Sequence, residues 1–337
     1  MAIPVNEVVQ ENVPESLVEL ITNADIGTTP VQAMFKKSMK KTSEDDLTSW
    51  GVKKHRSPNL KGVPDLQDVN KFNHNPRKKL YGIRQKSRDG VAVGDLASLN
   101  TVAGVSDEMV DQTDESLVVL ARSIEGRILC NHDCRDEDDG SEGKETRGAG
   151  SWLDTAEQAT LPVPTGYRPA ARSVVPFDEF DEDALKALSL TAYGERKGKA
   201  KMVGCVGIQL KSQISTWLSV QKDVTSKHNV RAVNQDASSK AYIECVDRIE
   251  IDSADIDLMV SDFLFLTNAE EAASTFATSY GGLFLMKDMW NLDFARDLRL
   301  IQMANQGGGD RAYADAVYTL ECLNPLGQFS YIPTALT

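Results

Sequence analysis

The spacing of apolar residues predicts few regular elements in the first third of the chain and several helices and strands after it. The clearest helix is expected from Asp107 to near Cys130, where apolar residues recur every three or four positions and acidic residues occupy the first turn. Helical spacing also covers residues 177–193 and 208–218, with the buried strand MVGCVGI between them.

Short apolar runs predict the remaining strands. The last of them, AVYTLECL, alternates apolar and polar residues in the way a half-buried strand does. Helices and strands in separate groups, without a repeated strand–helix alternation, predict the α+β class. The other expected strands are YIECV, RIEID, DIDLMV, FLFL and LFLMK.

Residues 43–103 show no sustained helical period. Short apolar pieces there are separated by turn signals such as SP, KG, VP, NP and DG, which is typical of a long two-stranded excursion. A structureless loop of this length is unusual inside a compact domain. We therefore expect the segment to project and to bind another molecule.

Charge is distributed unevenly along the chain. Between Lys36 and Arg88 there are 15 basic and five acidic residues, a net charge of +10, which leaves −23 on the rest of a chain whose total is −13. A charge run often marks nothing more than a solvated face. Its length here favours an arm that lies on the acidic surface of a neighbouring copy. The overall negative charge argues against general affinity for nucleic acid.

The sequence offers little catalytic chemistry. Cys130, His132 and Cys134 have side chains that could bind zinc, but no second pair follows at zinc-finger spacing. Five scattered cysteines fit reduced thiols, and no nucleophile elbow or phosphate-binding loop is present. We expect no catalytic residue, cofactor or bound metal, and no membrane segment, because no run approaches about 20 apolar residues.

Several blocks, in their order along the chain, resemble a known family. An early block is ADIGTTPVQAMFKK followed by TSWGV, and a middle block is SLVVLARSIEGRILCNHDC followed by ETRGAGSWL. The late blocks are VGIQLKSQISTW, DRIEIDSADIDLMVSDFLF, GGLFLMKDMW and DRAYADAVYTLECLNPLG. Together they resemble the major capsid proteins of tailed bacteriophages, whose fold is named after phage Hong Kong 97. The acidic insert at 133–145 departs from the family pattern in composition.

The resemblance implies a domain organisation and a role. The expected parts are an N-terminal arm (1–29), an extended loop (43–103), an axial domain (178–300), and a peripheral domain with a long spine helix (30–42, 104–177 and 301–337). The implied function is self-assembly into hexamers and pentamers of an icosahedral virion shell, which encloses double-stranded DNA without sequence-specific binding. Scaffolding, decoration and portal proteins are possible partners, and assembly would take place in the host bacterial cytoplasm.

Two alternatives stay open at this point. A bacterial nanocompartment shell of the same fold is the first, and a metal-dependent enzyme using Cys130, His132 and Cys134 is the more remote second. For the capsid reading, we predict that basic side chains of the extended loop pair with acidic patches of neighbouring copies and that Trp50 anchors the base of the loop. The basic residues are Lys53, Lys54, Arg56, Arg77, Lys78 and Lys79.

Overall fold

The computed structural model describes most of the 337-residue chain. The described residues are 29–38, 47–65, 68, 72, 74–95, 107–140, 142–222, 229–231, 246–266, 276–304 and 307–334. The predicted arm (apart from residue 29) and most of the predicted strand YIECV therefore lie outside the described residues. No described helix is both long enough and apolar enough to cross a membrane.

The chain forms two compact units. One contains residues 88–120 and 299–315 together with the first 28 residues, and the other contains 29–87, 121–298 and 316–337. Helix α3 (Glu108–Leu129) and strands β4 (Gln85–Val93), β12 (Trp290–Met303) and β13 (Asp310–Cys322) each begin in one unit and end in the other.

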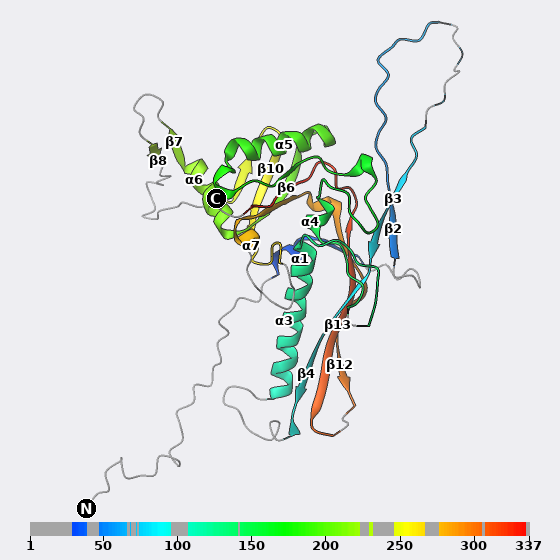
Figure 1. The fold of residues 1–337 in the computed structure, drawn as a ribbon, viewed down its shortest axis with the longest axis vertical. Helices are drawn as coiled ribbons and strands as arrows, with labels where there is room; N and C mark the ends of the chain where they lie inside the picture. Colours follow the sequence, from blue (N-terminus) through cyan, green and yellow to red (C-terminus); the bar gives the residue numbers. More distant parts are fainter. Residues whose placement is uncertain are drawn as a thin grey trace, which may run out of the picture. The chain divides into compact units, whose positions relative to one another are not determined.

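A six-stranded mixed sheet lies in the larger unit (Figure 1). Its centre is β6, which pairs in parallel with β10 and antiparallel with β11. In spatial order the strands are β5 (Arg172–Ser173), β14 (Phe329–Tyr331), β11 (Gly282–Leu285), β6 (Ala200–Val206), β10 (Ala254–Val260) and β9 (Arg248–Glu250).

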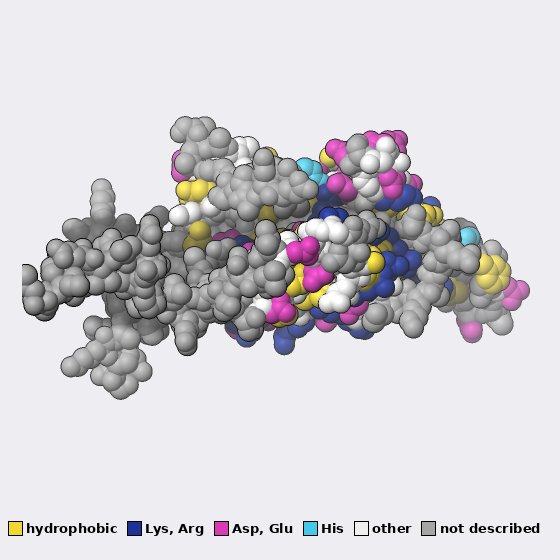
Figure 2. All heavy atoms as spheres, turned by 90° about the horizontal axis from the view of Figure 1, so that it is seen from below, with side chains coloured by type: hydrophobic (Ala, Val, Ile, Leu, Met, Phe, Trp, Pro, Cys, Tyr) yellow, Lys and Arg dark blue, Asp and Glu magenta, His cyan; other side chains and the backbone are white. Residues whose placement is uncertain are grey.

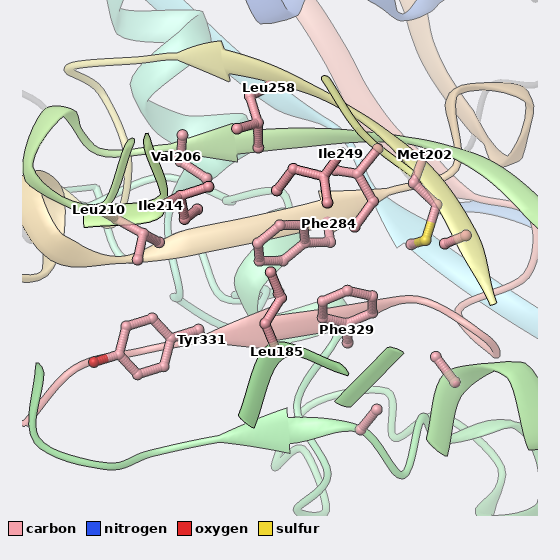
Figure 3. Close-up of a cluster of buried hydrophobic side chains, with 14 of the residues drawn as sticks. Leu185, Met202, Val206, Leu210, Ile214, Ile249, Leu258, Phe284, Phe329 and Tyr331 are labelled. Atoms are coloured by element: carbon pink, nitrogen blue, oxygen red, sulfur yellow. The ribbon is translucent and has the colours of Figure 1, made fainter. Parts of the chain in front are cut away.

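Helices α5 (Glu182–Arg196) and α6 (Ile208–Ser219) bury apolar side chains against this sheet. Figure 3 shows Leu185 of α5 and Leu210 and Ile214 of α6 directed toward Phe284 of the sheet. Each such large side chain, once fully buried, contributes about 1.5–3 kcal/mol. The core therefore holds the two helices and the sheet together as one body.

The predicted α+β class is confirmed, and so is the long helix. In α3, Leu120, Ile124 and Ile128 recur every four residues and are at most 2% exposed, as the apolar stripe predicts. The strand predicted at AVYTLECL is β13, which is longer than expected.

Two predictions from local pattern were wrong in part. The predicted strand FLFL is a turn, with Phe265 at a φ of 52°, in the left-handed region that no strand occupies. The helix predicted over 177–193 begins only at Glu182, because the side chain of Asp181 accepts a hydrogen bond from the N–H of Ala184 and caps the helix there.

Two further sheets contain strands from the first third of the chain. A four-stranded sheet has the order β1-β12-β13-β4, with β1 (Lys36–Ser38) parallel to β12. The two-stranded excursion expected from the sequence is present as β2 (Leu47–Val52) and β3 (Lys78–Ile83), which form an antiparallel sheet of their own.

The remaining elements are short. Helix α1 (Pro30–Met34) begins with proline, and strands β7 (Val220–Lys222) and β8 (Asn229–Arg231) pair with each other. The others are α4 (Ala149–Trp152), α7 (Phe276–Tyr280) and the 3-10 turns η3 (Thr165–Tyr167), η4 (Phe177–Glu179) and η5 (Lys287–Met289).

Candidate functional site: a basic hairpin and its anchor

We name residues 47–83, which comprise β2, β3 and the chain between them, the basic hairpin. Its stem is in regular antiparallel register from Leu47 opposite Ile83 to Val52 opposite Lys78. Residues 53–77 connect the two strands, and the described ones among them are drawn blue to cyan in Figure 1. The stem side chains alternate along β2 between more and less exposed positions, as a strand with one packed face requires.

Trp50 fixes the stem to the body of the larger unit. Its indole N–H donates a hydrogen bond of 2.9 Å to the carbonyl oxygen of Cys322, and its ring lies 5.8 Å from that of the fully buried Trp152. Gly82 makes room for this contact, because a Cβ there would lie 2.8 Å from the hydroxyl of Thr319 and 3.3 Å from the Trp50 ring. The attachment therefore depends on shape as well as on the hydrogen bond.

A buried arginine, Arg147, packs against the ring of Trp152. The guanidinium of Arg147 is 4.7 Å from the Trp152 ring, donates to Asp133 at 2.8 Å, and also donates to backbone carbonyls of residues 160 and 161. Burial alone would raise the pKa of Asp133, but the charge of Arg147 and the hydrogen bonds to this carboxylate outweigh burial and lower its pKa. The pair is thus ionised and held at the base of the hairpin.

Gly148 allows the backbone that follows Arg147 to pass close to Cys130. A Cβ at this position would overlap the carbonyl oxygen of Cys130 and lie 2.6 Å from its sulfur. Arg147, Gly148 and Trp152 all belong to the block ETRGAGSWL, which carries part of the resemblance. The structure shows what each residue does. Arg147 is a buried cation, Gly148 allows a close approach of two backbone segments, and Trp152 supplies an aromatic surface.

The predicted basic contact residues lie at the outer end of the stem and just beyond it. Lys78 and Lys79 belong to β3, whereas Lys53, Lys54, Arg56 and Arg77 belong to the connecting chain, and all six side chains are exposed. The stem brings the two groups together, because Val52 pairs with Lys78 and Gly51 pairs with Lys79. Whether these residues contact a neighbouring copy stays a prediction.

Sequence reasoning missed two features of the basic hairpin. One is Tyr167, whose hydroxyl accepts the backbone N–H of Lys54 at 3.0 Å and whose ring lies 5.5 Å from the Lys54 ammonium. The other is a set of exposed apolar side chains in the connecting chain, with Leu60 92%, Val63 69% and Phe72 84% exposed. The sequence does contain a signal for these side chains, since each is a large apolar residue placed singly in a polar stretch.

The acidic insert, residues 133–145, lies in a loop that we name the acidic loop (residues 133–147). Arg135 and Glu145 face each other through two backbone hydrogen bonds of 3.1 and 3.0 Å, and Arg135 also pairs with Asp139 and Glu142. The loop is tied to α3 where Arg127 pairs with Glu145 at 2.9 Å. The acidic loop is therefore held in a defined conformation by these contacts, and it presents exposed carboxylates.

Cys130, His132 and Cys134, the candidate zinc residues, lie in different surroundings. Burial raises the pKa of both thiols, that of Cys134 to about 11, while His132 is exposed. Among the residues that the structure describes, no group of three His, Cys, Asp or Glu side chains could hold a metal ion.

Comparisons with known proteins agree with one another. The family model described as SU10 major capsid protein matches residues 4–330. The capsid of cyanophage P-SCSP1u is similar in structure, with a TM-score of 0.62 at 10% identity over 96% of this chain and 94% of that one.

Two further capsids are similar at the level of fold. That of a native GTA particle has a TM-score of 0.63 at 10% identity over 98% of both chains, and that of Gordonia phage Cozz has 0.59 at 14% identity over 96% of this chain and 92% of that one. A comparison with curated protein sequences finds no significant match.

Proposed function

The chain belongs to the SU10 major capsid protein family, and from this premise we propose how its copies make contact in the shell. It is a structural major capsid protein of the tailed-phage type with the Hong Kong 97-type fold, and a component of the virion. The matches do not favour a nanocompartment shell or a metal-dependent enzyme. We infer that the chain has no catalytic function of its own.

The proposal is that copies join as hexamers and pentamers and that the basic hairpin of each copy lies on its neighbour. The observation that carries it is the combination of a fixed base with an exposed end. Trp50 holds the stem through the Cys322 carbonyl, while Leu60 and Phe72 farther along are more than four-fifths exposed. A neighbouring copy that covered these side chains would gain up to about 1.5–3 kcal/mol for each one fully buried.

Charge supports a neighbouring copy as that partner. The hairpin is strongly basic and the rest of the chain carries the compensating negative charge. Within the described residues, the acidic loop is one exposed surface of opposite sign. Complementary surfaces on two copies steer encounter and set register even when each ion pair is weak.

The larger plan of the shell is also part of this proposal. We assign residues 1–29 to an arm, 43–103 to the extended loop, 178–300 to the axial domain, and 30–42, 104–177 and 301–337 to the peripheral domain. The shell would enclose double-stranded DNA without reading its sequence, in keeping with the acidic chain. Scaffolding, decoration and portal proteins are further partners in this proposal, and assembly takes place in the host bacterial cytoplasm.

Reversing charges on the hairpin tests the proposal. In the variant Lys54→Glu, Arg56→Glu, Lys79→Glu we expect a loss of closed particles in velocity sedimentation and electron microscopy. At about 0.2–1 kcal/mol for each exposed pair, the loss is about 0.6–3 kcal/mol per copy, and every copy in the shell contributes it. The circular dichroism spectrum of the subunit should not change.

A matched control carries the same change of net charge elsewhere. Lys197, Lys201 and Lys287 are exposed and lie outside the hairpin, so their reversal to Glu should leave particle yield near that of the wild type. Normal particles from the hairpin variant, or an equal loss from the control variant, would show that the hairpin does not make this contact.

A further inference from the structure

An apolar pocket lies in the larger unit, beside the edge strand β9 of the six-stranded sheet. Its volume is about 200 Å³, and it is lined by α5, α6 and the chain that runs from β9 into the following turn. An apolar cavity of about 150 Å³ holds a benzene-sized molecule, so this one, which we name the apolar pocket, has room for one large apolar side chain. Its apolar lining residues are the buried Leu185, Ile214 and Ile249 and the half-buried Trp217 and Ile251.

The other residues that line the apolar pocket are charged, and most of them are acidic. They are Glu182, Lys186, Glu250 and Asp252. Lys186 pairs with Glu182 at 2.5 Å and Arg248 pairs with Glu250 at 3.1 Å, whereas Asp252 is exposed and accessible to an incoming cation. The pocket therefore suits a ligand that joins an apolar group to a positive charge.

The connecting chain of the basic hairpin carries such a pair of side chains. Leu60 is 92% exposed, and Lys61, which follows it, is also exposed. The stem of a lysine is long and flexible, so its ammonium can lie beside a carboxylate while the neighbouring leucine fills the cavity. Burying a leucine side chain shifts a binding equilibrium by about ten- to a hundredfold. An exposed ion pair adds much less, so the leucine supplies affinity and the lysine supplies orientation.

A second acidic surface, the acidic loop, matches the charge of the hairpin but not its leucine. Residues 133–147 contain no valine, leucine, isoleucine, phenylalanine or tryptophan. Contact with this loop alone would offer Leu60 no large apolar side chain to pack against. The apolar pocket offers both an apolar wall and carboxylates, and it is therefore the better match.

We propose that the apolar pocket of one copy binds Leu60 in the basic hairpin of a neighbouring copy, with Lys61 beside Asp252. This inference rests on the proposed function and deepens it, since it names the place on the neighbour where the hairpin binds. The contact is heterologous, because the pocket and Leu60 are different surfaces of the same chain. Heterologous contacts repeated around a rotation axis close into rings, as hexamers and pentamers require.

Cross-linking between copies tests the contact directly. Full-length chains carrying Lys61→Cys and chains carrying Asp252→Cys are mixed before assembly, oxidised and separated on a denaturing gel, and the linked peptides are identified by mass spectrometry. The expected result is a disulfide between the two introduced cysteines. Chains with Asp138→Cys replace those with Asp252→Cys as the control, because Asp138 is an equally exposed aspartate that lies in the acidic loop.

The control separates this inference from the proposed function. If Lys61→Cys links to Asp138→Cys as well as or better than to Asp252→Cys, the pocket is not the site, although the hairpin still lies on its neighbour. If particles form and neither variant is linked, the pocket and the contact of the hairpin both fall.

The concentration needed for assembly gives a second, independent readout. In the variant Leu60→Ser, particles on a sedimentation gradient should appear only at about ten- to a hundredfold higher protein concentration than in the wild type, which is the effect of losing one buried leucine per copy. The subunit itself should fold normally, because Leu60 is almost fully exposed in it. Leu60→Met keeps an apolar side chain of similar volume and should assemble like the wild type. Equal thresholds for Leu60→Ser and the wild type would overturn the contact.

Discussion

Replacing Gly148 with alanine should destabilise the subunit more than any conservative change at its surface. The added methyl group would overlap the carbonyl oxygen of Cys130, and this oxygen already accepts the N–H of Gly150 at 3.1 Å. This overlap can be relieved only if the backbone of Cys130 moves. Overpacking of this kind costs about 1–3 kcal/mol, and loss of the hydrogen bond adds about 0.5–1.5 kcal/mol. We expect the free energy of unfolding to fall by about 1.5–4.5 kcal/mol.

The measurement is urea denaturation of unassembled subunits, followed by far-ultraviolet circular dichroism. Gly143→Ala is the matched control, because Gly143 lies only five residues before Gly148, has no heavy atom within 4 Å of the added Cβ, and has no positive φ. That variant should match the wild type or gain a few tenths of a kcal/mol, roughly the entropy removed from the unfolded chain. If Gly148→Ala unfolds at the same urea concentration as Gly143→Ala, the turn is not as tightly closed as the argument requires.

Two further changes test the base of the basic hairpin. Trp50→Phe keeps a ring but removes the N–H that satisfies the buried Cys322 carbonyl, so urea denaturation should show a loss of about 1–3 kcal/mol; a loss below experimental error would contradict this. Asp133 has a pKa below its ordinary 3.8, so its ion pair stabilises the fold above pH 3.8 and is lost as pH falls through the lower folded pKa. The advantage of the wild type over Asp133→Asn should therefore shrink below pH 3.8, and a constant difference would contradict that assignment.

Elements with a strong local pattern were predictable from the sequence. The recurring apolar residues of α3 and the alternation in β13 depend on one face packing and the other not, which local spacing records. Trp50 was identifiable as an apolar residue on a short strand before a polar stretch. Its acceptor was not, because Cys322 lies 272 residues away along the chain.

Where local pattern failed, tertiary packing determined the outcome. Leu264, Phe265 and Leu266 of the run FLFL are buried, as its composition suggests, yet the run is a turn with Phe265 in a left-handed conformation. Burial alone does not distinguish a strand from an apolar turn.

The chain separates the interactions that fix its shape from those that are available to partners. Trp50, Gly82 and Gly148 act through close, dry contacts that tolerate little change in geometry. The connecting chain of the hairpin and the acidic loop instead present exposed charges, whose interactions are long in range and individually weak. A rigid base lets many weak contacts add in register, since a loosely attached hairpin would lose in conformational entropy what each pair contributes. In the proposed shell, the energy of assembly would therefore depend on the Trp50 anchor as well as on the exposed charges.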